Sequence, residues 1–322
     1  MLGNKIRTAV VGVGSLGRHH ARIYSELPQS DFVAVVDPVE DRAEEIASRY
    51  GCRALRDYRK ILGEVDAVSL AVPTTGHSEI GCHLLSEGVH VLVEKPISNT
   101  LEGADQLIEV QEKAGVILQV GHSERFNPAL TELGRHLTNP LFFEGHRLGF
   151  FVPRSLDVDV LLDLMIHDLD LVLTMSAQPV VETRSVGIPV LSDQVDIANA
   201  RIEFRNGCVA NLTASRVSNE KVRKLRFFQP GQYISIDFNG QQTEIFGVEE
   251  HTSKIINSSI IKGKPIEPLW AEISAFLDAV IGKQEDLWPG PCSAKEGRRA
   301  LQLALRLMDQ ISDHQNRVST SL

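Results

Sequence analysis

Two charged residues and a proline stand where a buried strand is expected to end. Glu94, Lys95 and Pro96 follow the apolar run 91–93. Adjacent residues of a strand point to opposite faces, so one charged side chain can meet a cofactor while the other meets a substrate. Pro96 stops the strand, and a cis bond before it would aim Lys95. A solvated Glu–Lys pair at a strand end is the alternative.

A second cluster of ionisable residues has helical spacing. Asp163 and His167 are four residues apart and share a helix face, and Asp170 follows one turn later. A histidine with a carboxylate one turn away can transfer protons near neutral pH. A partly buried histidine satisfied by a local carboxylate is the alternative. The spacing offers no convincing third metal ligand, so we expect no metal.

A glycine motif at the start of the chain predicts a dinucleotide site. Gly12, Gly14 and Gly17 form GxGxxG, with Ser15 and Leu16 between the last two glycines, after an expected strand and before an expected helix. Such glycines allow a tight turn and close approach of the backbone to a pyrophosphate. Asp37 follows 20 residues after Gly17, where a carboxylate would accept hydrogen bonds from the ribose.

The acid favours NAD over NADP, because a 2′-phosphate would meet its negative charge. Arg42 is close enough in sequence to help accommodate the 2′-phosphate of NADP, so it opposes the preference for NAD. The alternative is a glycine turn with an aspartate that only caps the next helix. His19 and His20 fall in the first turns after the glycines, where we expect packing or solvent-facing side chains, with a cofactor contact as the alternative.

Short apolar runs alternate with amphipathic segments over the first 122 residues. This alternation predicts a parallel, doubly wound sheet of Rossmann type. Residues 123–322 predict a second, α+β domain with a large, mostly antiparallel sheet, helices on one face, and a last helix that packs back on the first domain. The expected strands are 6–11, 32–36, 65–72, 89–93 and 116–120, with successive strands over 181–261 and an Asn206-Gly207 hairpin. The expected helices are 16–27, 41–50, 77–87, 101–114, 128–137, 160–175, 267–281 and 293–311.

Composition excludes several classes of protein. The formal charge of −9 disfavours binding to nucleic acid or to an anionic membrane. A basic cluster that begins at Lys221 falls along an expected strand and better fits a solvated or inter-subunit face. No apolar run approaches the ~20 residues that cross a bilayer. The four cysteines form no CxxC pair, so we expect a reduced, cytoplasmic compartment.

Together, the glycine motif, Glu94-Lys95-Pro96 and the Asp163…His167 pair resemble the glucose-fructose oxidoreductase/inositol dehydrogenase/MocA (Gfo/Idh/MocA) family over nearly the whole chain. The resemblance implies hydride transfer between a nicotinamide and a sugar or cyclitol carbinol, and homodimers or homotetramers that pair through the second sheet. It implies His167 as general base and Asp163 as substrate holder or tuning group. It also implies that Lys95 stabilises the reacting oxygen. The implied cofactor contacts further include Glu94 at the ribose and the nicotinamide-side residues Pro73, Thr74 and His77.

The stretches 121–128 and 154–160 are similar to those of nucleotide-sugar members of the family. This similarity implies oxidation of a UDP-N-acetyl-hexosamine at C3 to a 3-keto sugar nucleotide, which a partner aminotransferase could use. Arg125 and Arg154 would bind the diphosphate, with Asn127 as a further substrate contact. A surface salt bridge is the alternative for each arginine. One alternative is a dehydrogenase of a free sugar or cyclitol such as myo-inositol. Another is a regulator that binds NAD(H) without catalysis.

Overall fold

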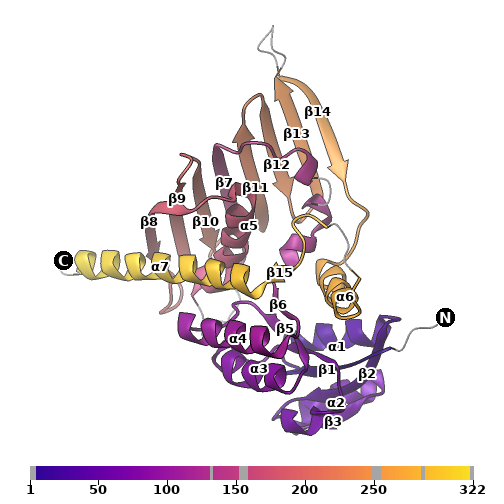
Figure 1. Cartoon of the computed structure of the whole chain (residues 1–322). Coiled ribbons are helices and arrows are strands. Elements are labelled where there is room, and N and C mark those ends of the chain that lie inside the picture. Colours follow the sequence, from indigo (N-terminus) through magenta and orange to yellow (C-terminus); the bar gives the residue numbers. More distant parts are fainter. Residues whose placement is uncertain (1–4, 131–132, 152–158, 249–254, 284–286, 320–322) are drawn as a thin grey trace. The chain divides into compact units, whose positions relative to one another are not determined.

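The structure, a computed structural model, describes residues 5–130, 133–151, 159–248, 255–283 and 287–319. The chain divides into two compact units (Figure 1). The first contains Met1–Phe126 and Glu267–Arg298, and the second contains Asn127–Ile266 and Arg299–Leu322. The expected domain boundary near residue 122 stays a prediction. Among the described residues, no helix is both long and apolar enough to cross a membrane.

The first unit is built on a seven-stranded sheet in the order β15-β6-β5-β4-β1-β2-β3. Strand β15 pairs antiparallel with β6, and the other neighbours are parallel. The parallel part therefore has the strand order 3-2-1-4-5-6 that is typical of dinucleotide-binding folds. The strands are β1 (Ile6–Val11), β2 (Ser30–Val36), β3 (Arg53–Leu55), β4 (Ala67–Leu70), β5 (His90–Glu94), β6 (Leu118–Gly121) and β15 (Cys292–Ser293).

Helices cover both faces of this sheet. Apolar residues of α6 share one buried cluster with α1 and the strands β1 and β2, including Phe276 and Tyr24. Helices α3 and α4 pack together against the other face. The helices are α1 (Gly17–Glu26), α2 (Glu40–Tyr50), α3 (His77–Ser86), α4 (Leu101–Ala114) and α6 (Pro268–Val280). The expected doubly wound fold is confirmed.

The second unit is an eight-stranded sheet in the order β14-β13-β12-β11-β7-β10-β9-β8. Only the β7–β10 pair is parallel among these described neighbours, so the expected antiparallel sheet is confirmed. Its strands are β7 (Phe142–Leu148), β8 (Val180–Ile188), β9 (Ile197–Phe204), β10 (Val209–Ser215), β11 (Val222–Gln229), β12 (Gln232–Asp237), β13 (Gln242–Val248) and β14 (Ile255–Lys262). Strand β7 precedes the region 181–261 where strands are expected. The Asn206-Gly207 turn joins β9 and β10 as expected, and Gly207 has a φ of +82°.

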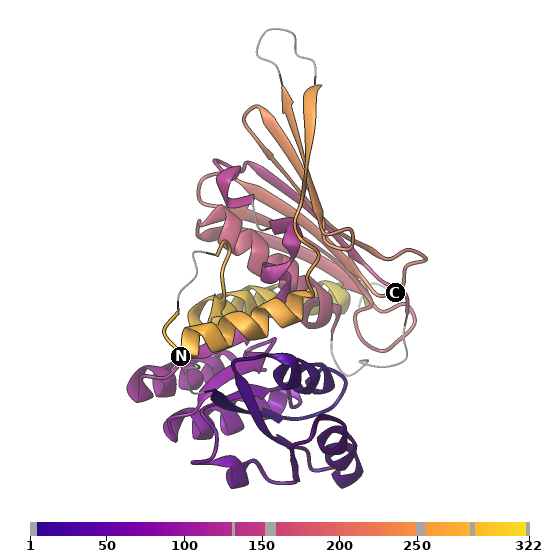
Figure 2. The ribbon, with the colours of Figure 1, turned by 90° about the vertical axis from the view of Figure 1, so that its right-hand side faces the viewer.

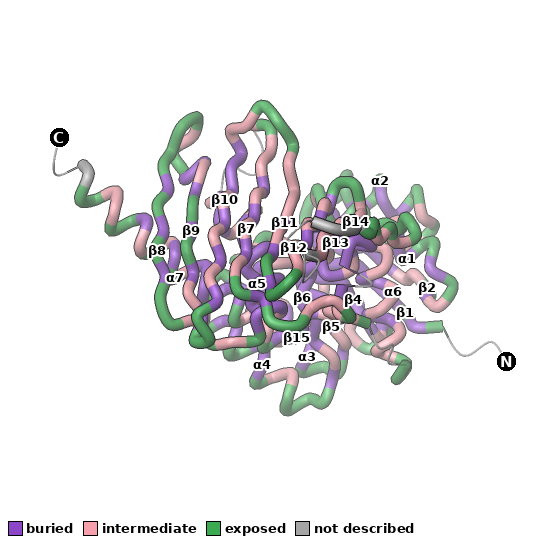
Figure 3. Tube along the Cα trace, turned by 90° about the horizontal axis from the view of Figure 1, so that it is seen from above, coloured by how far each residue is buried: buried purple, intermediate pink, exposed green. Residues whose placement is uncertain are grey.

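Side chains alternate between the two faces of this sheet. Along β7, Phe143, Gly145 and Arg147 are buried, whereas the residues between them are only partly covered (Figure 3). On the buried face lie α5 (Ile166–Ser176) and the later part of α7 (Ala294–Ser319), where Ser185 donates to the Leu307 carbonyl. Within the described residues of this unit, the opposite face carries no helix (Figure 2).

One expected helix is wrong. Residues 128–137 form two short 3-10 turns, η4 (Pro128–Leu130) and η5 (Leu133–Arg135), with residues 131–132 outside the described part. The amide N–H of Ala129 donates to the Asn127 side chain at 3.1 Å, and the Ala129 carbonyl accepts from Thr243 of β13 at 2.6 Å. The backbone N–H and carbonyl of Ala129 therefore form hydrogen bonds with a side chain and with the sheet in place of the hydrogen bonds of a continuing helix.

Candidate active site

The glycine loop brings the carboxyl ends of β1 and β4 together. Gly12 has a φ of +89°, and a Cβ there would lie 2.7 Å from the backbone of Ala71. A Cβ on Gly17 would lie 1.8 Å from the Gly12 carbonyl oxygen. Only glycine fits these two positions, because the first α1 turn packs directly on the loop. Strands β1 and β4 flank the point where the strand order reverses, which is where such sheets bind dinucleotides.

The loop leaves room for an anion at the start of α1. A Cβ on Gly14 would meet no atom within 4 Å, so the backbone can be approached closely there. Ser15 and Leu16 are exposed beside it. Helix α1 has no side-chain cap at its N-terminus and no acidic residue in its first turn. Its first N–H groups and its dipole therefore suit a pyrophosphate, and these residues fit the dinucleotide that the motif predicts.

Asp37 is buried at the end of β2 and is engaged on both carboxylate oxygens. Its Oδ2 accepts from the backbone N–H of Val13, and its Oδ1 accepts from the N–H of Val39, both at 3.0 Å. Arg42 Nη1 donates to the two oxygens at 3.3 and 3.2 Å. The acid thus lies beside the glycine loop, and the arginine that could accept a 2′-phosphate is paired with it.

The loop after β4 is tied to the loop after β5. Pro73 precedes the turn η2 (Thr74–Gly76), and His77 begins α3. The His77 ring is buried, with Nδ1 3.0 Å from the Pro96 carbonyl oxygen and Nε2 3.0 Å from that of Val72. Burial lowers the pKa of His77 although both carbonyls favour its protonated form. His77 therefore joins the two loops, and its contact with the cofactor stays a prediction.

Glu94 turns inward from the end of β5. Its Oε1 lies 2.8 Å from His20 Nε2 on α1, and its Oε2 accepts from the Lys95 N–H at 3.2 Å. Burial disfavours the carboxylate, but the hydrogen bond from His20, the charge of Lys95 and the hydrogen bond from the Lys95 backbone N–H outweigh burial and lower the pKa of Glu94. Lys95 is half-buried, and the Lys95–Pro96 bond is cis, as expected. The burial of His20 fits the expected packing side chain, and its contact with Glu94 was not predicted from the sequence.

In the second unit, Asp163 and His167 lie on consecutive turns with an irregular start. Asp163 falls in the π-helical turn η6 (Leu161–Met165), and His167 falls in the first turn of α5. Both side chains are half-buried. Asp159 caps the segment by accepting from the Leu161 N–H at 2.9 Å, and burial raises the pKa of Asp159. Single π turns inside helices are frequent at functional sites, and the catalytic role of Asp163 and His167 stays a prediction.

A buried ion pair fixes α5 to the sheet next to His167. Arg147 of β7 donates to both oxygens of Asp168, with Nε–Oδ2 at 3.0 Å and Nη2–Oδ1 at 2.7 Å. The Arg147 guanidinium also lies over the Phe238 ring, 5.6 Å from its centroid. Two-point pairing of this kind sets the rotation of the helix that carries His167. The sequence held no signal for this pair, because β7 itself was not expected.

Two of the expected substrate residues, Arg125 and Asn127, have partners within their own units. Arg125, in η3 (Ser123–Phe126), is buried and donates from Nη1 to Glu296 Oε1 at 3.1 Å. Asn127 donates from Nδ2 to the Phe238 carbonyl at 3.1 Å. Arg154 lies outside the described residues. The proposed contacts of these three residues with a diphosphate sugar stay predictions.

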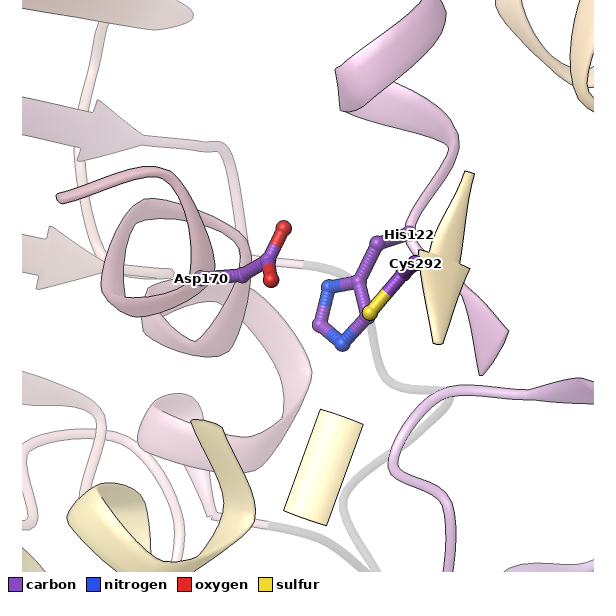
Figure 4. Close-up of side chains that lie close together, drawn as sticks. All are labelled: His122, Asp170 and Cys292. Atoms are coloured by element: carbon purple, nitrogen blue, oxygen red, sulfur yellow. The ribbon is translucent and has the colours of Figure 1, made fainter. Parts of the chain in front are cut away.

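His122 and Cys292 are neighbours at the edge of the first sheet (Figure 4). His122 follows β6, and Cys292 of β15 pairs with Val120 of that strand. A ring nitrogen of His122 lies within 4.8 Å of Cys292 Sγ. Asp170, also drawn in Figure 4, belongs to α5 of the second unit. Two residues do not supply the four ligands of a structural zinc site, so the pair carries no metal assignment.

Comparison with known proteins decides the family. Residues 6–122 match the family described as an oxidoreductase family with an NAD-binding Rossmann fold, and residues 136–249 match the Gfo/Idh/MocA C-terminal domain. The chain is also 38% identical over 307 residues to UDP-N-acetylglucosamine 3-dehydrogenase of Acidithiobacillus ferrooxidans, covering 94% of this chain and 96% of that protein. The chain belongs to the Gfo/Idh/MocA family.

Other members of the family place this chain among NAD-binding dehydrogenases. The solved structure of the Acidithiobacillus enzyme superposes with a TM-score of 0.88 at 37% identity, covering 95% of this chain and 98% of that one. The scyllo-inositol 2-dehydrogenase (NAD(+)) of Bacillus subtilis is 29% identical over 234 residues, 67% of this chain and 68% of that protein. The expected family, fold class and NAD-binding oxidoreductase activity are therefore confirmed.

Proposed function

We propose that this protein oxidises the C3 hydroxyl of a UDP-N-acetyl-hexosamine, with UDP-N-acetylglucosamine as first candidate, and gives a 3-keto sugar nucleotide. The observation that carries the proposal is the extent of the match to the 3-dehydrogenase. That match covers 94% of this chain, including most of the second unit, whereas the inositol enzyme matches 67%. Substrate choice in this family is expected to depend on that unit, so similarity there supports a shared substrate.

The first unit supplies the groups that hold the dinucleotide. The backbone at Gly14 and the N-terminus of α1 would bind the pyrophosphate, and Asp37 would accept from the ribose. Pro73, Thr74 and His77 would line the nicotinamide side. When bound, NAD accepts a hydride from the carbinol carbon.

The proton of the same carbinol must leave with the hydride. His167 acts as the base that takes it, and Asp163 holds the substrate or tunes His167. Lys95 donates to the reacting oxygen and stabilises negative charge as the O–H bond breaks. Reversal of these steps would reduce the ketone, so the same residues serve both directions.

A direct test is NADH absorbance with cofactor-stripped protein at mildly alkaline pH. NADH formation with NAD and UDP-N-acetylglucosamine, and a 3-keto product identified by NMR, are the expected results. UDP-glucose, run in parallel, tests whether the acetamido group is needed. UDP-N-acetylgalactosamine tests whether the configuration at C4 matters. Absence of NADH with all three nucleotide sugars would contradict the proposed substrate.

A second candidate is a dehydrogenase of a free cyclitol or sugar. The identity to the scyllo-inositol enzyme favours it. NADH formed from inositol or glucose but not from the nucleotide sugars would establish it. NAD binding without turnover of any of these compounds would favour the regulator.

The partner proposed for the second unit is another copy of this chain. Phe142, Phe228, Tyr233 and Phe246 form a row across four strands on the sheet face opposite α5, with successive ring centroids 5.9, 5.0 and 5.1 Å apart. Phe228 is 39% exposed. The other three rings are partly exposed, and contiguous apolar side chains at a surface are typical of interfaces. The same face carries the pairs Arg226–Glu144 and Lys224–Asp237, whose mixed charge suits self-association.

Light scattering tests this interface. Wild-type protein is expected to be a dimer or tetramer, and Phe228→Lys is expected to shift it toward smaller species. Ile281→Lys, at an exposed apolar residue directly after α6 in the first unit, is the control and should leave the oligomeric state unchanged. A monomeric wild type would contradict the proposal.

A 3-keto sugar nucleotide is a substrate for transamination, so we place a partner aminotransferase after this reaction. NAD and UDP-sugars are made in the cytoplasm, which is the compartment we propose. Coupled formation of a 3-amino sugar nucleotide in the presence of an amino donor and such a transaminase would test the order of the two reactions.

A further inference from the structure

Four buried side chains form a hydrogen-bonded line beneath the glycine loop. Tyr24 Oη lies 2.9 Å from Ser69 Oγ, Ser69 Oγ lies 2.9 Å from His20 Nδ1, and His20 Nε2 lies 2.8 Å from Glu94 Oε1. Tyr24, His20 and Ser69 have no exposed surface, and Glu94 is 8% exposed. The line joins α1, β4 and the end of β5.

The two ends of the line set the direction of its hydrogen bonds. Burial raises the pKa of Tyr24, so its hydroxyl stays protonated and donates to Ser69. The lowered pKa of Glu94 keeps that end an acceptor. Ser69 can then donate to His20 Nδ1, which leaves the proton on Nε2 to be donated to Glu94. Every polar hydrogen in the line thus has an acceptor, as buried polar groups require.

Glu94 has little freedom to turn elsewhere. A Cβ on Gly121 of β6 would lie 3.2 Å from the Glu94 carboxyl carbon, so the neighbouring strand closes that side. The other carboxylate oxygen accepts from the Lys95 backbone N–H. The hydrogen bond from His20 therefore fixes the Glu94 carboxylate, and this carboxylate in turn holds the backbone N–H of Lys95.

We propose that His20 is a positioning residue, which holds Glu94 and through it Lys95 in register with the helix that binds the dinucleotide phosphates. The proposal rests on the proposed function for its kinetic readout only. Because α1 carries both the phosphate-binding N-terminus and His20, a single rigid helix sets the cofactor and the Lys95 peptide relative to each other.

Removal of the His20 donor has a specific electrostatic consequence. The ionisable groups around Glu94 are His20 on α1, Lys95 directly after β5 and His77 on α3, while Glu272 of α6 acts on Tyr24. Without His20, the causes that still lower the pKa of Glu94 against its burial are the charge and the backbone N–H of Lys95. The pKa of Glu94 then rises, and a protonated Glu94 appears at higher pH than in the wild type.

The decisive comparison is His20→Asn with His20→Gln. The longer Gln amide reaches the place of Nε2 and can still donate to Glu94, whereas the Asn amide reaches only the place of Nδ1. We expect His20→Asn to lower kcat/KM for NAD by about tenfold to hundredfold, the effect of losing a hydrogen bond to a buried charge, and to move its acidic limb to higher pH. His20→Gln should recover most of the loss. His19→Leu, at the exposed neighbouring histidine of α1, is the control and should match the wild type.

An infrared titration of the cofactor-free protein gives a readout that needs no substrate. The carboxylic-acid C=O band of Glu94, identified by its loss in Glu94→Gln, should appear at higher pH in His20→Asn than in the wild type. If His20→Asn does not fold, Ser69→Ala replaces it, and the same upward shift is expected. Equal kinetics of the Asn and Gln variants, or an unshifted Glu94 titration, would overturn the proposal. A wild type that is inactive on UDP-N-acetylglucosamine would contradict the proposed substrate and leave the titration to decide on His20.

Discussion

The carboxylate of Asp37 accepts a hydrogen bond from the backbone N–H of Val13 at 3.0 Å. The acid at the end of β2 therefore supports the glycine loop that follows β1, besides any contact with the ribose. Arg42 pairs with the same carboxylate. The acid that favours NAD and the arginine that could accept the 2′-phosphate of NADP are therefore in direct contact.

Replacement of Asp37 is expected to change cofactor preference. Asp37→Ser should weaken NAD binding about tenfold, because a ribose acceptor is lost, and should strengthen NADP binding, because Arg42 is released to meet the 2′-phosphate. Isothermal titration with each cofactor measures the ratio. Asp37→Ser/Arg42→Ala should lose the gain for NADP, while Arg49→Ala, at an exposed arginine of the same helix, should leave both affinities unchanged. An unchanged NAD/NADP ratio in Asp37→Ser would remove Asp37 as the selector.

Two glycines of the loop should respond differently to alanine. At Gly14 a methyl group meets no protein atom, so Gly14→Ala should fold with an unchanged Tm but bind NAD poorly, because the methyl occupies the approach to the pyrophosphate. At Gly12 the positive φ and the contact with Ala71 should cost about 1–3 kcal/mol of stability as well. Thermal unfolding and NAD titration of both variants separate the two effects. Tight NAD binding by Gly14→Ala would contradict the assigned approach of the pyrophosphate.

Much of this architecture follows from the sequence because local and global signals agree. Glycine, apolar strand and amphipathic helix recur in register, so the end of β5 and the positions of Gly12, Asp37 and Lys95 could be predicted. The orientation of the Glu94 side chain could not be predicted, because strand alternation does not identify His20 of α1 as its buried partner. The helix expected over 128–137 is wrong, because the side chains of Asn127 and Thr243 form hydrogen bonds with the backbone N–H and carbonyl of Ala129. Distant partners such as Arg147 and Asp168 leave no local pattern.

A buried carboxylate in the second unit should make stability depend on pH. Asp196 accepts from three successive backbone N–H groups, those of Val190, Leu191 and Ser192, and from Arg216 Nε at 2.8 Å. Burial raises its pKa, but these donors outweigh burial and hold the pKa of Asp196 well below its usual range. A depressed folded-state pKa stabilises the fold fully above the unfolded pKa of about 4, and this contribution is lost as pH falls through the folded value.

Urea unfolding of the wild type and Asp196→Asn at pH 7 and below pH 4 tests this dependence. The variant should be less stable at pH 7, and the difference should shrink on acidification. Asp193→Asn changes an exposed aspartate in the same turn and should behave like the wild type. A stability difference that does not vary with pH would show that Asp196 acts through packing alone.

The final prediction concerns the two groups proposed to act on the carbinol. Lys95→Met removes the donor to the reacting oxygen, and His167→Asn removes the base while keeping a similar shape. Each should lower kcat about 100-fold or more. NAD affinity, measured by titration, should stay near that of the wild type in His167→Asn, because the role proposed for this residue is to take a proton and not to bind the phosphates.

The pH profile distinguishes the two roles. Proton removal needs an unprotonated base, so wild-type activity should rise with pH along a limb that His167→Asn lacks and Lys95→Met retains. Arg147→Met tests whether the anchor of α5 matters separately: loss of the partner of Asp168 should lower the free energy of unfolding by about 3–5 kcal/mol and reduce kcat without removing that limb. Full activity in Lys95→Met or His167→Asn would exclude that residue from catalysis, and a retained limb in His167→Asn would assign the base to another group.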